Sequence, residues 1–518
     1  MTEAGLPEEH GSEPGGLQRR TARGLTWTMI QTWGGQALSL VVFVILARLL
    51  TPSDFGLVAL AAVFVALAQL VVDQGLGDAL IQRREITQRQ IDTAFWVAVA
   101  TGVLLAAGLA LLAGPIAGLL REPDLTPILQ VLSLTFILSA LASIPIALLT
   151  RALAFRLLAI RAVLSIVGGG IVGIGMALTG FGAWALVGQQ VTQALLSVVT
   201  LWSVTPWKPR AEFSRADFAV LFPFGVKVLG SDILGFVGRN ADNLLIGAYL
   251  GTGPLGFYAV GYRILDVSQR LLINVARKIT FPVFSRLQHD PSRMARAYLR
   301  VTRVAAVLII PAYVGLALVS PELTVFVFGP TWAESGPVAA VLFLSGPVLA
   351  LQAFSGSLLY ATGHPGVVLQ FRVITTIAVV IGFVIALPFG IVAVAAAFTA
   401  RCYLFLPLLL IWTRRYGGVG VRATLGEVRT TTVATIAMSV VVVAVKVVAG
   451  DVLGPGGLLL VEITAGAATF LVAAWLMEPG LLLETWGLAE QAIPGLARIQ
   501  RRLTGSQAGA QPRPGGRP

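Results

Sequence analysis

Long apolar runs separated by short polar turns dominate this chain of 518 residues. A helix needs about 20 apolar residues to cross the hydrocarbon core of a bilayer, and about fourteen runs approach or exceed that length. The pattern predicts an all-α, polytopic membrane protein with about 14 transmembrane helices. The expected spans are 25–48, 53–75, 93–119, 126–150, 158–178, 183–205, 218–249, 254–284, 301–320, 336–360, 366–388, 391–412, 430–449 and 456–477.

The spans group into larger units. We expect a disordered cytoplasmic tail (1–23), because this stretch is polar and rich in Gly and Glu. The apolar run that follows is too long for a signal-peptide core, so it is expected to be a retained first helix. The remaining units are an N-lobe of helices 1–6 (24–205), a cytoplasmic linker (206–217), a C-lobe of helices 7–12 (218–412), helices 13 and 14 (430–477), and a basic cytoplasmic tail (478–518).

Composition and charge agree with a membrane protein. Only 12% of the residues are charged, against about 25% in soluble proteins. Most of the 37 Lys and Arg residues lie in the two tails and in the even-numbered loops. The positive-inside rule therefore places both termini in the cytoplasm. The net charge of +12 reflects this topology and not nucleic-acid binding.

The residues for several kinds of chemistry are missing from the sequence. The single cysteine and three scattered histidines provide neither a disulfide framework nor a metal-binding cluster. There is no GxxxxGK[ST] phosphate loop, so ATP hydrolysis by this chain is not expected. We therefore predict a protein that is not an enzyme and has no cofactor or metal.

An internal repeat relates the two lobes. The segment Leu50–Ala59 aligns with Leu250–Ala259, 200 positions later, and each forms the outer turn between the first two helices of a lobe. Both copies begin on the cytoplasmic side. The lobes are therefore predicted to be parallel repeats of six helices, with helices 13 and 14 as an appendage.

Ionisable residues interrupt helices 7 and 8, between Phe218 and Phe284. Charges inside a membrane span are costly and therefore usually face a cavity or a partner. Counted at 1.5 Å per residue from the outer turn, the charges fall into three rows of like depth and opposite sign. The rows are Asp242 with Arg263, Arg239 with Asp266, and Asp232 with Arg270, while Lys227 lies nearer the cytoplasm.

Two interpretations of these charges remain open. Arg239, Arg263, Arg270 and Lys227 could line a cavity and bind an anionic substrate, because a guanidinium donates two parallel hydrogen bonds to phosphate. Alternatively, Asp232, Asp242 and Asp266 neutralise the cations within the hairpin or bind a coupling ion, and Lys227 snorkels. The same choice applies to Arg401 on helix 12, whereas Arg372, near the start of its helix, is expected to snorkel.

The first lobe offers amides in place of charges. Gln31, Gln36, Gln189, Gln190 and Gln193 could bind sugar hydroxyls or hold helices together. The glycines between 168 and 175 are expected to allow close helix packing.

Several motifs mark a family. They are ARLLTPSDFGL (47–57), DQGLGDALIQRREIT (73–87), ADNLLIG (241–247), LGFY (255–258), FPVFSRLQ (281–288) and VFGPTW (327–332). On these segments the sequence resembles the Wzx-type exporters, in the colanic-acid and teichuronic-acid exporter-like group of the polysaccharide-transporter branch of the MOP flippase superfamily.

The resemblance implies a flippase of the bacterial inner membrane that moves undecaprenyl-diphosphate-linked oligosaccharide from the inner to the outer leaflet by alternating access. Its expected partners are this lipid substrate, the membrane, and the polymerase and glycosyltransferases of the same pathway. The family's basic central cavity would correspond here to Arg239, Arg263, Arg270 and Arg401.

Two other functions are alternatives. A drug or cation antiporter of the same superfamily would need a cavity dominated by carboxylates and no row of arginines. A membrane-embedded glycan polymerase would need a large outer loop with catalytic groups. The longest expected outer loop, about 320–336, offers only Glu322 and Glu334.

Overall fold

The computed structural model of the protein describes residues 33–72, 77, 80–81, 86–215, 235–273, 280, 283–450 and 452–492. These residues form helices joined by short turns, with no β-strand among them. Ten of the helices are long and apolar enough to cross a membrane, or eleven if one bent pair counts as a single span. The all-α polytopic fold is confirmed. The total of fourteen stays a prediction, because parts of the first, seventh and eighth spans lie outside the described residues.

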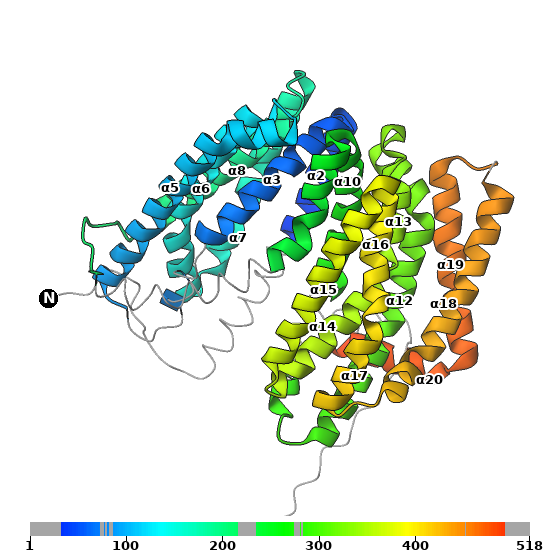
Figure 1. The fold of residues 1–518 in the computed structure, drawn as a ribbon. Helices are drawn as coiled ribbons and strands as arrows, with labels where there is room; N and C mark the ends of the chain where they lie inside the picture. The colour runs from blue at the N-terminus through cyan, green and yellow to red at the C-terminus, as the bar shows by residue number, and fades with distance from the viewer. Residues whose placement is uncertain are drawn as a thin grey trace, which may run out of the picture.

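The helices form two groups that Figure 1 shows side by side, with a smaller pair beyond the second group. The first group contains α2 (Gly35–Leu49), α3 (Pro52–Val72), α5 (Gln88–Leu120), α6 (Leu125–Arg151), α7 (Phe155–Leu178) and α8 (Trp184–Val204). The second contains a helix over 235–250, α10 (Thr252–Ser268), the π-helical turn η2 (Gln269–Ile273), α12 (Pro291–Phe328), η3 (Pro330–Trp332), α13 (Ser335–Phe343), α14 (Gly346–Ala361), α15 (Pro365–Ala386), η4 (Leu387–Phe389), α16 (Ile391–Leu404) and α17 (Leu406–Gly417). The last helices are α18 (Val421–Ala449), α19 (Pro455–Met477) and α20 (Pro479–Ala492).

The boundaries of the helices support the predicted repeat. Helix α6 covers 125–151, and the bent pair α13–α14 covers 335–361, which is 210 positions later at both ends. Helices α7 and α15 also begin 210 positions apart, and α8 and α16 begin 207 apart. The fourth, fifth and sixth helices of the two lobes therefore correspond.

Helix α12 is longer than hydropathy predicted. It begins at Pro291, where the side chain of Asp290 accepts a hydrogen bond from the backbone N–H of Arg293, and it continues to Phe328. A capping Asp followed by Pro starts a helix in polar sequence, whereas a hydropathy window finds only the membrane-embedded part. Three arginines between the expected spans 254–284 and 301–320 thus lie on the helix: Arg293, Arg296 and Arg300.

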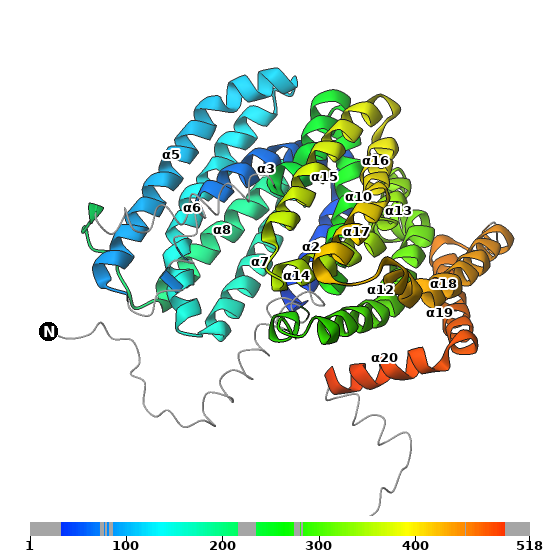
Figure 2. The same cartoon turned by 60° about the horizontal axis from the view of Figure 1, so that its bottom comes forward.

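The end of the chain also differs from the expected basic tail. Helices α18 and α19 pack against α12 and against each other, and α20 follows α19 at an angle that Figure 2 shows clearly. Arg300 of α12 forms a 2.7 Å salt bridge with Glu484 of α20, and Arg303 pairs with Glu478. The first part of the expected tail is therefore helical and held to the C-lobe by ion pairs.

The two lobes touch through a reciprocal contact between α3 and α10. A Cβ on Gly56 of α3 would lie 1.7 Å from the carbonyl oxygen of Thr252, and a Cβ on Gly256 of α10 would lie 1.8 Å from that of Pro52. Gly56 and Gly256 are equivalent positions of the repeat, 200 residues apart. Because each glycine lacks a side chain, the other helix can approach its backbone closely, as happens at small residues in membrane helix pairs.

A cluster of aromatic rings surrounds this crossing. The indole N–H of Trp332 donates to the carbonyl oxygen of Ala47 over 2.7 Å. The Trp332 ring also packs edge-on against Phe55 and Phe257. Nearby, Arg48 at the end of α2 donates to the carbonyl oxygens of residues 326 and 327 at the end of α12. Several motifs that mark the family thus build the contact between the lobes, at the end of the bundle that the charge pattern predicts to be outside.

This contact can be tested by adding one methyl group. We expect Gly56→Ala and Gly256→Ala to lower the free energy of unfolding by about 1–3 kcal/mol, because each introduced Cβ overlaps a backbone carbonyl. Gly253→Ala is the matched control, since a Cβ there meets nothing within 4 Å. Thermal unfolding of the purified protein in detergent measures the difference. Equal midpoints for all three variants would contradict the close crossing.

Candidate functional site

A cavity of about 750 Å³ lies within the C-lobe. Its walls come from the helix over 235–250, α10 and η2, α14, α15, α16 and α17. Three arginines from three different helices line it: Arg239, Arg372 and Arg401. Among the described residues of its lining there is neither Asp nor Glu. The lining is therefore strongly cationic.

Close helix packing and local stacking position these cations. A Cβ on Gly238 would lie 3.0 Å from the hydroxyl oxygen of Thr376, so the helix that carries Arg239 lies directly against α15, which carries Arg372. On α16, the Arg401 guanidinium lies 4.9 Å from the centre of the Phe398 ring and donates to the sulfur of Cys402 over 3.2 Å. Its buried Nε atom has no hydrogen-bond partner in the structure.

Neutral polar and aromatic groups complete the lining. The two rings Phe371 and Trp412 pack edge-on with centroids 6.1 Å apart. The polar and aromatic residues of the lining are Tyr262, Gln269, Gln352, Ser357, Tyr360, Phe371, Thr375, Thr376, Phe398 and Trp412. Fixed cations with amides, hydroxyls and aromatic faces can bind an anion that carries hydroxyl-rich or ring-shaped groups.

A second group of charges lies on α10 and η2, and its Arg263 faces the N-lobe. The Arg263 guanidinium donates to the Ser39 hydroxyl of α2 over 3.2 Å and lies 5.7 Å from the centre of the Phe43 ring. Asp266 is 3.7 Å from Arg263 and 3.0 Å from Arg270. We call Arg263, Asp266, Arg270 and Ser39 the interlobe network. Neither Arg263 nor Arg270 is among the residues that line the C-lobe cavity.

The opposite-charge rows expected from depth differ from the contacts observed. Asp242 is 3% exposed and accepts hydrogen bonds from the Tyr258 hydroxyl over 2.7 Å and from the backbone N–H of Asn243, whereas Arg263 pairs with Asp266. Depth fixes a height along the helix but not a direction around it. The i, i+3 and i, i+4 spacings of α10 already bring Asp266 to both arginines. Lys227 and Asp232 lie outside the described residues.

Sequence reasoning missed Arg372. It was expected to snorkel because it lies near the start of its helix, but α15 begins at Pro365, and the eighth residue of the helix faces the cavity. The short turn after α14 places the beginning of α15 beside the other cavity helices. Gln352, Tyr360 and Trp412 were likewise not singled out, because single polar or aromatic residues carry no signal of their orientation.

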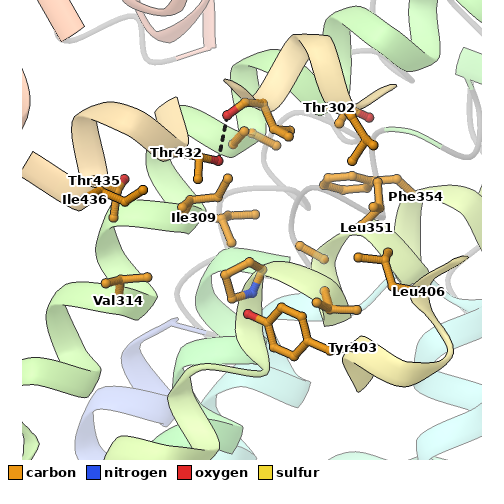
Figure 3. A pocket seen from close by; sticks show the side chains of 18 of the residues that line it. Thr302, Ile309, Val314, Leu351, Phe354, Tyr403, Leu406, Thr432, Thr435 and Ile436 are labelled. Carbon is orange, nitrogen blue, oxygen red and sulfur yellow. Dashed lines mark hydrogen bonds between the residues drawn. The ribbon is translucent and has the colours of Figure 1, made fainter. Parts of the chain in front are cut away.

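A separate, apolar cavity of about 290 Å³ lies between the C-lobe and α18. Figure 3 shows Ile309, Leu351, Phe354 and Leu406 at its walls, with threonine hydroxyls at the margin. Helix α14 separates the two cavities, because Leu351 and Phe354 line this one and Gln352 lines the cationic one. No charged side chain is among the described residues of its lining.

Two lobes of membrane-spanning helices beside a cationic cavity define a multi-pass membrane transporter. The fold is similar to that of the lipid II flippase MurJ in an inward closed conformation, with a TM-score of 0.69 and 15% identity, over 88% of this chain and all of that one. It is also similar to an inward-facing multidrug resistance MATE transporter of the MOP superfamily, with a TM-score of 0.60 and 14% identity, over 76% of this chain and 98% of that one. These likenesses confirm the predicted fold.

The chain belongs to the polysaccharide biosynthesis protein family, whose pattern it matches over residues 45–337. It is 31% identical to the succinoglycan biosynthesis transport protein ExoT of Rhizobium meliloti, over 64% of this chain and 67% of ExoT. It is 27% identical to the lipopolysaccharide biosynthesis protein WzxC of Escherichia coli, over 71% of this chain and 76% of WzxC. The resemblance to Wzx-type proteins is confirmed.

The charge of the C-lobe cavity can be measured with thiol reagents. Cys402 is fully buried, so we expect it to react slowly. In a Gln352→Cys variant, the rates of reaction of the new thiol with an anionic and a cationic methanethiosulfonate are each divided by the rate for a free thiol. The normalised rate should be higher for the anionic reagent, because the arginines attract anions. Arg239→Gln with Arg372→Gln should reduce this preference. A preference for the cationic reagent would contradict the assignment.

Proposed function

We propose that this protein flips an oligosaccharide linked by diphosphate to undecaprenol across the bacterial cytoplasmic membrane by alternating access. One observation carries the proposal: Arg239, Arg372 and Arg401 converge on one cavity whose described lining holds no carboxylate. Membership of the polysaccharide biosynthesis family supports the nature of the cargo. Both termini are proposed to be cytoplasmic.

The diphosphate is the part of this substrate that the cavity suits best. A planar guanidinium forms paired, charge-assisted hydrogen bonds with phosphate oxygens. The unpartnered Nε of Arg401 offers one such donor without a competing carboxylate. Tyr262, Gln352 and Trp412 line the same cavity and suit the sugar next to the diphosphate.

A cation antiporter fits this cavity poorly. An amphiphilic cation needs a carboxylate for attraction, and three guanidinium groups would repel it. The likeness to a MATE transporter, at 14% identity, concerns the fold. The charge of the C-lobe cavity therefore favours an anionic substrate.

The interlobe network is placed to couple binding to movement of the lobes. Arg263 of the C-lobe bonds Ser39 of the N-lobe, and Asp266 holds Arg263 and Arg270 together. A diphosphate bound in the C-lobe cavity would not contact these two arginines, because neither lines that cavity. Breaking the Arg263–Ser39 bond would free the lobes to rock about the Gly56–Gly256 crossing.

The membrane potential can drive part of this transport. An inside-negative potential favours outward movement of an anion by about 2.3 kcal/mol per charge per 100 mV. Glycosyltransferases on the cytoplasmic side would supply the lipid-linked oligosaccharide, and a polymerase or transferase on the other side would use it. These enzymes are the proposed partners.

Translocation in proteoliposomes tests the proposal. We expect the purified protein to move a fluorescent undecaprenyl-diphosphate oligosaccharide between leaflets without ATP. Arg239→Gln, Arg372→Gln and Arg401→Gln should each lower the rate about tenfold or more, since a lost charge-assisted hydrogen bond costs about 1.5–3 kcal/mol.

Arg422→Gln is the matched control, because Arg422 is an exposed arginine of α18 that is not among the residues lining the cavity. Equal rates for all four variants and the unmodified protein would overturn the role of the cavity. Failure of the unmodified protein to move the lipid would overturn the proposed function itself.

The interlobe network makes a different prediction. Arg263→Ala with Arg270→Ala should slow translocation while leaving the affinity for the diphosphate lipid within about threefold, because neither residue lines the cavity. Binding and transport are measured on the same preparation. A loss of affinity as large as that of the cavity variants would place both arginines in the binding site.

A further inference from the structure

The N-lobe contains a polar cavity of its own, of about 410 Å³, between α6, α7 and α8. Its polar lining consists of Thr135, Arg161, Ser165, Gln190, Gln193 and Ser197. Arg161 is the seventh residue of α7. The described lining includes one cation and no carboxylate.

This cavity is the repeat counterpart of the cationic cavity in the C-lobe. Helices α6, α7 and α8 correspond to α13–α14, α15 and α16, as the boundaries show. With the 210-residue offset of these helices, Arg161 corresponds to Phe371 and Ala162 to Arg372, so the two cations lie one position apart on equivalent faces. On the next helix, Gln193 of α8 lies near the position that Arg401 occupies in α16. The N-lobe cavity thus keeps one guanidinium and has an amide near the position of the other.

Polar atoms in this cavity lack partners. The Ser165 hydroxyl is on a residue that is 7% exposed, and neither it nor the buried Nε of Arg161 has a hydrogen-bond partner in the structure. Arg161 donates through Nη1 to the Ser197 hydroxyl over 3.1 Å. Unpaired polar groups inside a membrane bundle are costly. Their convergence on one hollow therefore points to a polar ligand.

Helix packing alone does not account for these side chains. Helices α7 and α8 already approach closely through glycines, since a Cβ on Gly169 would lie 2.7 Å from the Gln189 carbonyl oxygen and one on Gly173 would lie 3.2 Å from that of Ala185. This confirms the packing role expected for Gly169 and Gly173, whereas a Cβ on Gly175 would meet nothing within 4 Å. Gln193 also packs on Gly169, and Arg161 bonds Ser197 across the two helices, which leaves the Ser165 hydroxyl and the Arg161 Nε available for another role.

We propose that this cavity is a subsite for an acidic sugar of the transported oligosaccharide, which rests on the proposed function. The fork of Arg161 binds the carboxylate of a uronic acid in bidentate fashion. Gln190, Gln193, Ser165 and Ser197 bind the hydroxyls of the ring. The C-lobe cavity thus holds the diphosphate and the N-lobe cavity recognises the sugar, so each lobe grips a different part of one substrate.

Two matched substrates test the division. One is an undecaprenyl-diphosphate trisaccharide that ends in glucuronic acid, and the other is the same lipid with its carboxylate reduced to the alcohol. We expect Arg161→Gln to lower translocation of the acidic lipid about tenfold and that of the reduced lipid less than twofold. Arg156→Gln, an exposed arginine in the first turn of the same helix, is the control and should affect neither.

The outcomes separate the two proposals. Equal losses for both lipids in Arg161→Gln would mean a structural role, and no loss for either would mean no role, so each result overturns the subsite while the flippase proposal stands. Loss of both lipids in Arg372→Gln, with the selective effect in Arg161→Gln, supports the division of labour. Failure of the unmodified protein to move either lipid would overturn both proposals.

Discussion

The close crossing of α3 and α10 is the contact on which the arrangement of the two lobes depends. Gly56 and Gly256 meet each other's helices at backbone distance, and membrane helices without side chains between them gain dispersion contacts along their length. This crossing puts Trp332 against Phe55 and Phe257. It also sets α10 beside α2, so that Arg263 can reach Ser39. Because both glycines occupy the same place in the repeat, the contact is shared equally by the lobes.

The charged groups described in the C-lobe are of two kinds. On α10, Asp266 sits between two arginines and neutralises part of their charge. Within the C-lobe, Arg239, Arg372 and Arg401 line a space whose described lining lacks a carboxylate. The charges around Asp266 stabilise one arrangement of the two lobes, and the cationic cavity is complementary to an anion. A transporter needs both, because binding must compete with the contacts that hold one state.

The repeat explains why the lobes can share this task without being identical. Equivalent helices line a cavity in each lobe, and their polar side chains differ: Arg372 and Arg401 in one, Arg161 and Gln193 in the other. The fold thus preserves the position of each cavity, while individual residues change its charge. Two unequal cavities suit a substrate whose two ends differ in chemistry.

The fold was predictable because apolar runs and basic loops are local signals, and the bilayer leaves a chain few ways to satisfy its backbone. The repeat and the family were likewise readable from Leu50–Ala59 and its copy. Which residues form the candidate site was only partly predictable from the sequence. Counting along the sequence found Arg239 and Arg401, but it placed Asp242 opposite Arg263 and assigned Arg372 to the membrane surface.

The amino-acid sequence by itself determined that this is a helical, multi-pass membrane protein of two repeated lobes with cations inside the membrane. Tertiary structure alone decided which cations share a cavity, which are paired with Asp266, and that Arg161 belongs to a counterpart cavity. The physical reason is that hydropathy fixes the depth of a residue in the bilayer. Which neighbour the residue faces is decided only when the helices pack, as the close approach of Gly238 to Thr376 shows.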